Sequence, residues 1–129
     1  MEEIVLETRI DLVDFLYKNQ DPNDSSYDYE YVILKYSATW CKPCSVVKPI
    51  IEQELNNIDA RLNGQKNKYI FIEVDVDECF DLYAFLKKQK MINGIPALFL
   101  YSRKIYKDYD KDKMYIPQAS ISGTKEDQI

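Results

Sequence analysis

Apolar residues recur along the chain at two spacings, and these spacings predict strands and helices in alternation. Residues 31–36 (YVILKY) and 69–76 (YIFIEVDV) are β-branched, aromatic and mostly apolar, which is typical of interior strands. Residues 95–101 (IPALFLY) form a third such run, with a proline near its start. Residues 4–6 suggest a short first strand, and Ile121 suggests a last one.

Between these runs the apolar residues follow helical spacing. The predicted helices cover about residues 9–18, 45–62 and 79–89. Thr8 is placed to cap the first helix, with Asp11 as its capping-box partner. Pro49 lies inside the second and should kink it, because proline removes a backbone N–H. Strands alternating with helices predict an α/β sandwich, in which the strands at 31–36 and 69–76 are parallel.

Two polar stretches separate the regular segments. Residues 19–30 contain a proline and few apolar residues, so we expect a surface loop. Residues 106–115 alternate Asp, Lys and Tyr, which suits a solvated hairpin. Their three aspartates resemble the first half of a calcium loop, but Lys113 stands where such a loop needs glycine. We therefore expect no calcium site.

Length and charge narrow the class of protein. The chain has 129 residues, enough for one domain with one hydrophobic core, so residues 1–129 are expected to form a single domain. A net charge of −5 argues against nucleic-acid binding. No apolar run approaches the roughly 20 residues that span a bilayer, and the acidic start lacks a signal-peptide core. A cytoplasmic monomer without membrane contact is the expectation.

Cys41 and Cys44 lie between a predicted strand and a predicted helix. Two cysteines at this spacing can close a small disulfide ring or hold part of a metal site. The helix N-terminus favours a thiolate over a thiol, which suits thiol–disulfide exchange. Zinc is disfavoured, because the chain has no histidine and only three cysteines. We expect neither a metal nor an organic cofactor.

Several motifs together resemble the thioredoxin family over roughly residues 3–123. They are WCKPC at 40–44, Pro49, VDVD at 74–77, GIP at 94–96 and Gly123. The resemblance implies a three-layer sandwich with a mixed central sheet flanked by helices. The family's C-terminal helix is nearly absent here; either the sequence is shortened at its end, or apolar sheet surface is left for a partner.

The resemblance also implies an activity and roles for individual residues. Cys41 would be the exposed nucleophile and Cys44 the buried resolving thiol of a thiol–disulfide oxidoreductase, which acts on protein disulfides with a reductase or thiol oxidase as its redox partner. Pro96 would be cis and face the cysteines. Lys42 replaces the family's usual glycine and should favour the Cys41 thiolate, making the site more oxidising. The residues implied to contact a substrate are Trp40, Lys42, Pro43, Gly94, Ile95, Pro96 and Gly123.

One departure from the family pattern concerns two charges. The family's buried acid corresponds by position to Lys35, and the lysine that commonly faces that acid corresponds to Glu73. A buried charge needs a partner, so we predict a Lys35–Glu73 pair under the active site, with Glu73 as the nearest candidate base. The alternative is that both side chains reach solvent and that Cys44 loses its proton to water.

Three further alternatives stay open. Trp40 is either an ordinary core residue or a residue whose ring shields the Cys41 thiolate, and the second interpretation is favoured. Cys79 resembles an extra cysteine of many animal thioredoxins and is a buried, inert thiol or a regulatory one. The whole domain can be an interaction module that uses its groove or an uncovered sheet face, with redox chemistry secondary. Glutathione chemistry of the glutaredoxin type is a weaker option.

Overall fold

A computed structural model describes residues 4–62 and 69–122 of the chain. The helices are α1 (Arg9–Gln20), α2 (Lys42–Leu62), α3 (Phe80–Lys88) and α4 (Arg103–Tyr106), with one 3₁₀ turn, η1 (Lys111–Lys113). The strands are β1 (Tyr31–Ser37), β2 (Tyr69–Asp75), β3 (Ala97–Ser102) and β4 (Ala119–Ser122). The stretches that would hold Gly123 and any C-terminal helix lie outside the described residues.

Within the described residues, four strands form one mixed sheet in the order β2-β1-β3-β4. The prediction of an interior strand at 69–76 is therefore wrong: β2 lies at an edge of the sheet, and residues 4–6 form no strand. β1 and β2 are parallel, as predicted, and their register places Lys35 opposite Glu73. β3 runs antiparallel to β1 and also to β4. In this arrangement the end of β1, which leads to the cysteines, lies beside the start of β3, because Tyr36 pairs with Ala97.

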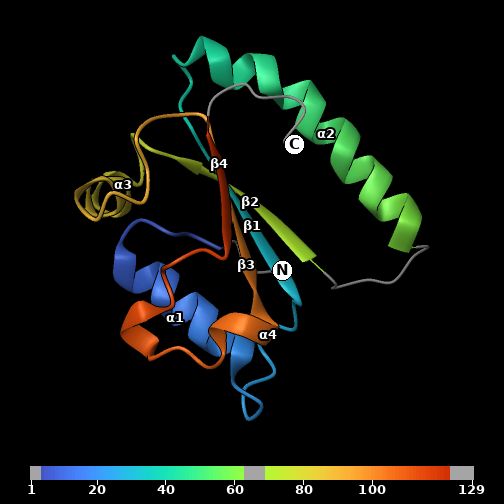
Figure 1. Ribbon diagram of the computed structural model, residues 1–129, viewed down its shortest axis with the longest axis vertical. Coiled ribbons are helices and arrows are strands. Elements are labelled where there is room, and N and C mark those ends of the chain that lie inside the picture. The colour runs from blue at the N-terminus through green and yellow to red at the C-terminus, as the bar shows by residue number, and fades with distance from the viewer. Residues whose placement is uncertain (1–3, 63–68, 123–129) are drawn as a thin grey trace.

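Helices cover both faces of the sheet, so the predicted three-layer sandwich is confirmed. Figure 1 shows α2 on one face and α1, α3 and α4 on the other. Side chains alternate between the faces of a strand. Val32, Leu34 and Tyr36 of β1 are fully buried in the main core, which also contains Leu12, Leu16 and Leu82 of the helices.

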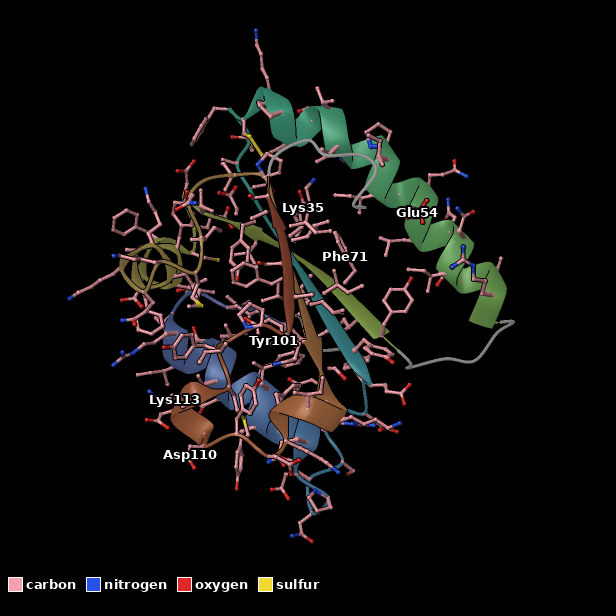
Figure 2. The ribbon with its side chains drawn as sticks, viewed as in Figure 1. Lys35, Glu54, Phe71, Tyr101, Asp110 and Lys113 are labelled. Carbon is pink, nitrogen blue, oxygen red and sulfur yellow. A yellow bond between two sulfur atoms is a disulfide. The ribbon has the colours of Figure 1, made fainter. Side chains whose placement is uncertain are left out.

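The face toward α2 is less completely filled. Figure 2 shows Lys35 and Phe71 on this side of the sheet and Tyr101 on the opposite side. An apolar cavity of about 200 Å³ separates α2 from the strands. Its lining includes Ile33, Leu55, Ile58, Phe71, Leu98 and Ile121.

The predicted start of α1 is confirmed. The Asp11 N–H donates to Thr8 Oγ1 and the Thr8 N–H donates to Asp11 Oδ2, both at 3.1 Å, which closes the capping box. α2 begins at Lys42, three residues earlier than predicted, so Cys44 belongs to its first turn. Pro49 lies inside α2, and the kink expected there stays a prediction.

Two predicted elements are wrong. Residues 4–6 do not form a strand. The backbone that follows them bonds to helices instead: the Glu7 N–H donates to Asp11, and the Glu7 carbonyl accepts the N–H of Leu82 in α3. The segment therefore meets no strand edge with which to pair.

Residues 106–115 do not form a solvated hairpin either. Tyr106 and Met114 are buried, although charged residues surround them in the sequence. Because both side chains are in the core, the segment between them has to be compact. It contains helical turns: α4 ends at Tyr106, and η1 lies just before Met114. The loop at 19–30 is also less exposed than predicted, because α1 continues to Gln20 and Asn19 is buried.

Candidate redox site

Cys41 and Cys44 are joined by a disulfide at the start of α2, with their Cα atoms 5.3 Å apart. Cys41 directly precedes the first residue of the helix, and its N–H donates to the carbonyl of Ala38 at 3.1 Å. The Cys44 N–H donates to Cys41 Sγ at 3.2 Å. A reduced Cys41 would therefore lie at the positive end of the helix dipole, with a backbone donor already directed at its sulfur.

The prediction of an exposed Cys41 is wrong for the disulfide form. Cys41 and Cys44 are each only 4% exposed. The reason is local: each sulfur covers the other, and Cys41 Sγ lies against the first turn of α2. Lys42 and Pro43, between the two cysteines, are exposed, so the ring presents these side chains to solvent.

Trp40 is 66% exposed, which rules out a place in the core. Its Nε1–H donates to Asp77 Oδ2 at 2.8 Å. This bond ties the residue before the first cysteine to the turn after β2. The sequence analysis missed the role of Asp77, although its position directly after a buried strand near the CxxC turn was a usable signal.

The Ile95–Pro96 peptide bond is cis, as predicted. Pro96 directly precedes β3, whose first residue, Ala97, pairs with Tyr36 near the end of β1. The register thus brings the Ile95–Pro96 segment to the same edge of the sheet as the CxxC turn. Gly94 has open space around the position of a Cβ, so its lack of a side chain is not required by packing. Gly123 lies outside the described residues.

The predicted Lys35–Glu73 pair is present. Lys35 Nζ lies 3.4 Å from Glu73 Oε1, and the same oxygen accepts a 3.0 Å hydrogen bond from Ser37 Oγ. The sequence analysis missed Ser37. Since it is two residues after Lys35 on one strand, its side chain was bound to share the same face.

A cavity of about 250 Å³ is lined both by this pair and by Cys44 of the disulfide. Its lining comes from β1, β2 and the first turns of α2, and it includes Lys35, Ser37, Cys44, Lys48, Glu73 and Asp75. Cys44 and both members of the ion pair therefore line one cavity. The roles predicted for Lys35 and Glu73 stay predictions.

Cys79 is a free, buried cysteine at the residue before α3. Burial raises the pKa of its thiol, and the nearby carboxylates of Glu7 and Glu78 raise it further. Both effects disfavour the thiolate, which is the reactive form of cysteine.

Neither a metal site nor a membrane span is found in residues 4–62 and 69–122. Within these ranges no three His, Cys, Asp or Glu side chains are grouped closely enough to hold a metal ion. No helix there is both long and apolar enough to cross a bilayer.

Comparison with known proteins places this site in a family context. A family model described as thioredoxin matches residues 19–118. Thioredoxin of Oryctolagus cuniculus is 40% identical over 65 residues, which are 50% of this chain and 53% of that protein. Human thioredoxin is 36% identical over 63 residues, covering 49% of this chain and 51% of its own length. The chain thus spans about half the length of the curated relatives that it matches.

Solved structures show the same fold at lower identity. A Plasmodium falciparum thioredoxin has a TM-score of 0.55 and 20% identity, covering 98% of this chain and 91% of its own. Reduced thioredoxin of Schistosoma mansoni has a TM-score of 0.56 and 20% identity, over 95% of this chain and 87% of its own. At this identity the structures support the architecture alone.

Proposed function

The chain belongs to the thioredoxin family, and from that premise we propose that it is a thiol–disulfide oxidoreductase acting on protein disulfides. The observation that carries the proposal is the Cys41–Cys44 disulfide at the N-terminus of α2. A cysteine pair that closes into a disulfide at the start of a helix can store and release two electrons. No metal or organic cofactor is needed for this chemistry.

Reduction of a substrate proceeds in two exchanges. The Cys41 thiolate attacks one sulfur of the substrate disulfide, the substrate S–S bond breaks, and the departing sulfur takes a proton. Cys44 then loses its proton and attacks Cys41 Sγ, which breaks the mixed disulfide and releases the second substrate thiol. Two electrons pass to the substrate and the Cys41–Cys44 disulfide remains.

The proton of Cys44 needs an acceptor in the second exchange. We propose Glu73, because its carboxylate lines the same cavity as Cys44 and is open to water at 51% exposure. Lys35 and Ser37 hold one oxygen of that carboxylate in place. Direct loss of the proton to cavity water is the competing route.

The substrate is proposed to lie along the exposed edge formed by the CxxC turn and the start of β3. Trp40, Lys42 and Pro43 are exposed there. Gly94, Ile95 and Pro96 lie in the segment before β3, where Gly94 and Ile95 are half-buried and Pro96 is buried. An extended peptide can pair with the backbone at Ile95, in the manner of an added strand. A role for Gly123 in substrate binding also belongs to the proposal.

The cellular setting is proposed from chemistry. Three cysteines, with Cys79 free and buried, fit a reducing compartment, so we propose a cytoplasmic monomer that takes part in electron transport. Its redox partner would be a reductase, or a thiol oxidase if electrons flow the other way. A net charge of −5 supports protein rather than nucleic-acid substrates.

The first test is equilibration of the chain with glutathione redox buffers, followed by quantification of the Cys41–Cys44 disulfide. A reversible two-electron transition near the roughly −270 mV of thioredoxin indicates a reductase, and a value tens of millivolts higher indicates an oxidant. The second test uses insulin as the disulfide substrate. Cys44→Ser should accumulate a mixed disulfide and Cys41→Ser should not. A chain with no reversible transition is not a redox enzyme.

A second candidate function is an interaction module. The apolar cavity between α2 and the sheet favours it, because apolar surface there is left incompletely filled within the described residues. Cys41→Ser separates the two functions: a binding module keeps its partner after this change, whereas disulfide reduction is lost.

A further inference from the structure

Lys35 differs from the other charged side chains by its burial. Among the described residues it is the only Lys, Arg, Asp or Glu in the buried class, with 3% of its side chain exposed. Apolar residues flank it across the sheet on one side, where Leu98 is its partner in β3. A buried charge is screened far less by water and salt than an exposed one.

Glu73, the counter-charge to Lys35, is much more exposed to water than Lys35 itself. Glu73 is 51% exposed, and its Oε1 lies 3.4 Å from Lys35 Nζ, a long separation for an ion pair. Water therefore weakens the field of the carboxylate much more than that of the ammonium. Of the three N–H donors of Lys35, the bonds found in the described residues use one, the donor directed to Glu73.

The Lys35 side chain, with its two other N–H donors, lines the same cavity as Cys44. The charged groups around that cavity are Lys35 from β1, Glu73 and Asp75 from β2, and Lys48 from α2. Glu73 and Lys48 are exposed and Asp75 is half-buried. The formal charges of these four groups cancel, but their exposures differ. Lys35 is the least exposed of them, so its charge is screened least and dominates the potential at Cys44.

We propose that Lys35 is a positioning residue that sets the redox balance of the site by stabilising the Cys44 thiolate. This inference rests on the proposed function. The reaction concerned is protein dithiol plus oxidised glutathione giving protein disulfide plus two molecules of glutathione. A cation that stabilises the reduced protein as a thiolate shifts this equilibrium toward the dithiol, which makes the disulfide a stronger oxidant.

The sign and the pH dependence follow from this mechanism. Lys35 can act only while Cys44 is ionised in the reduced protein. At low pH Cys44 carries its proton with or without Lys35, so the two equilibria should coincide. As pH rises through the ionisation of Cys44, the protein with Lys35 should become increasingly more oxidising than the protein without it. A purely structural effect of Lys35 would have no such dependence.

The experiment compares the wild type with Lys35→Met in glutathione buffers from about pH 5 to pH 9. Methionine keeps the length of the side chain, and the carboxylate left behind is exposed, so the variant should fold. An opposite charge nearby commonly shifts an ionisation by one to three units, so we expect about a tenfold change toward the disulfide at the alkaline end. That change corresponds to a reduction potential about 30 mV lower.

Two matched variants sharpen the test. Lys48→Met removes an exposed lysine from the same cavity, and it should change the equilibrium about twofold or less because water already screens that charge. Glu73→Gln removes the charge that offsets Lys35, so it should shift the equilibrium in the opposite direction, toward the dithiol. In a Cys41→Ser, Cys79→Ala background, absorbance of the single Cys44 thiolate at 240 nm should show its midpoint moving to higher pH with Lys35→Met.

The outcomes separate a failure of this inference from a failure of the proposed function. A wild-type couple that Lys35→Met leaves unchanged at every pH, or shifts equally at every pH, overturns the inference and leaves the proposed function intact. If Lys35→Met fails to fold, Glu73→Gln decides: a shift toward the disulfide, or none, overturns the inference. A wild type without any reversible couple overturns the proposed function and this inference with it.

Discussion

The side chain of Asn19 should hold together three segments that lie far apart in the sequence. It is 2% exposed, near the end of α1. Its Nδ2 donates to the Tyr29 carbonyl and to the Tyr106 hydroxyl, and its Oδ1 accepts the Tyr29 N–H, all at 2.8 Å. The three bonds join α1, the 21–30 loop and α4. We predict that Asn19→Ala will destabilise the whole domain.

The magnitude follows from the bonds lost. A net hydrogen bond contributes about 1 kcal/mol, so three give about 3 kcal/mol as an upper figure. Tyr29 is half-buried, and water can replace part of what its backbone loses, so we expect a fall of about 2–3 kcal/mol in the free energy of unfolding. For a chain of this size that corresponds to a Tm lower by about 10 °C.

Urea denaturation followed by circular dichroism measures this change. Asn23→Ala is the matched control, because Asn23 is exposed and its side chain makes no bond among those found, so its cost should stay within about 0.5 kcal/mol. Tyr106→Phe removes one of the three bonds and should cost about 1 kcal/mol alone. In the Asn19→Ala background that cost should vanish. A loss below about 1 kcal/mol for Asn19→Ala, or equal costs of Tyr106→Phe in both backgrounds, would refute the reasoning.

Three further predictions concern ionisation, capping and the free thiol. Burial raises the pKa of Tyr106 to about 12, so the unfolded chain loses this proton first as pH rises above about 10. The protonated hydroxyl therefore contributes about 2–3 kcal/mol to the free energy of unfolding below pH 10, and this contribution is lost as pH rises toward 12. Tyr106→Phe should make the urea midpoint fall less steeply in that pH range. Thr8→Ala should lower the unfolding free energy by about 1 kcal/mol, and an unchanged urea midpoint would contradict the capping box. Burial and neighbouring carboxylates raise the pKa of Cys79, so iodoacetamide should modify Cys41 of the reduced protein well before Cys79; equal rates would show that Cys79 is not shielded.

The parts of the fold that followed from the sequence are those that one-dimensional patterns specify. β1 and β2 are long apolar runs, and such runs are typical of strands. The run alone does not give the place in the sheet: β1 is interior, whereas β2 lies at an edge among the described residues. Their parallel pairing follows from the helix between them. The Lys35–Glu73 pair was predicted from the family resemblance, which placed both charges, together with the need of a buried charge for a partner. Of the two strands beside β1, β2 offers Glu73 at this position and β3 offers Leu98.

The parts of the fold that did not follow from the sequence depend on tertiary contacts between distant segments. Tyr106 and Met114 are single apolar residues among charged neighbours, so neither produces a periodicity, yet both are buried in the main core. Asn19 had the same disadvantage, since an asparagine near a helix end is usually solvated. Cys41 is buried in a state in which its sulfur is bonded to Cys44, and the sequence does not specify the oxidation state.

The Lys35–Glu73 pair shows that two proteins can keep the same ion pair and still differ in its effect on the active site. Because the two residues are direct partners in a parallel ladder, exchanging their charges between strands preserves the ion pair and costs the fold little. The exchange does not preserve burial: the β1 position is enclosed and the β2 position is open to water. A carboxylate enclosed at the first position would repel a thiolate at Cys44, whereas the ammonium attracts it. Two chains with the same fold and the same CxxC motif can thus differ in redox balance through one pair of residues beneath the site.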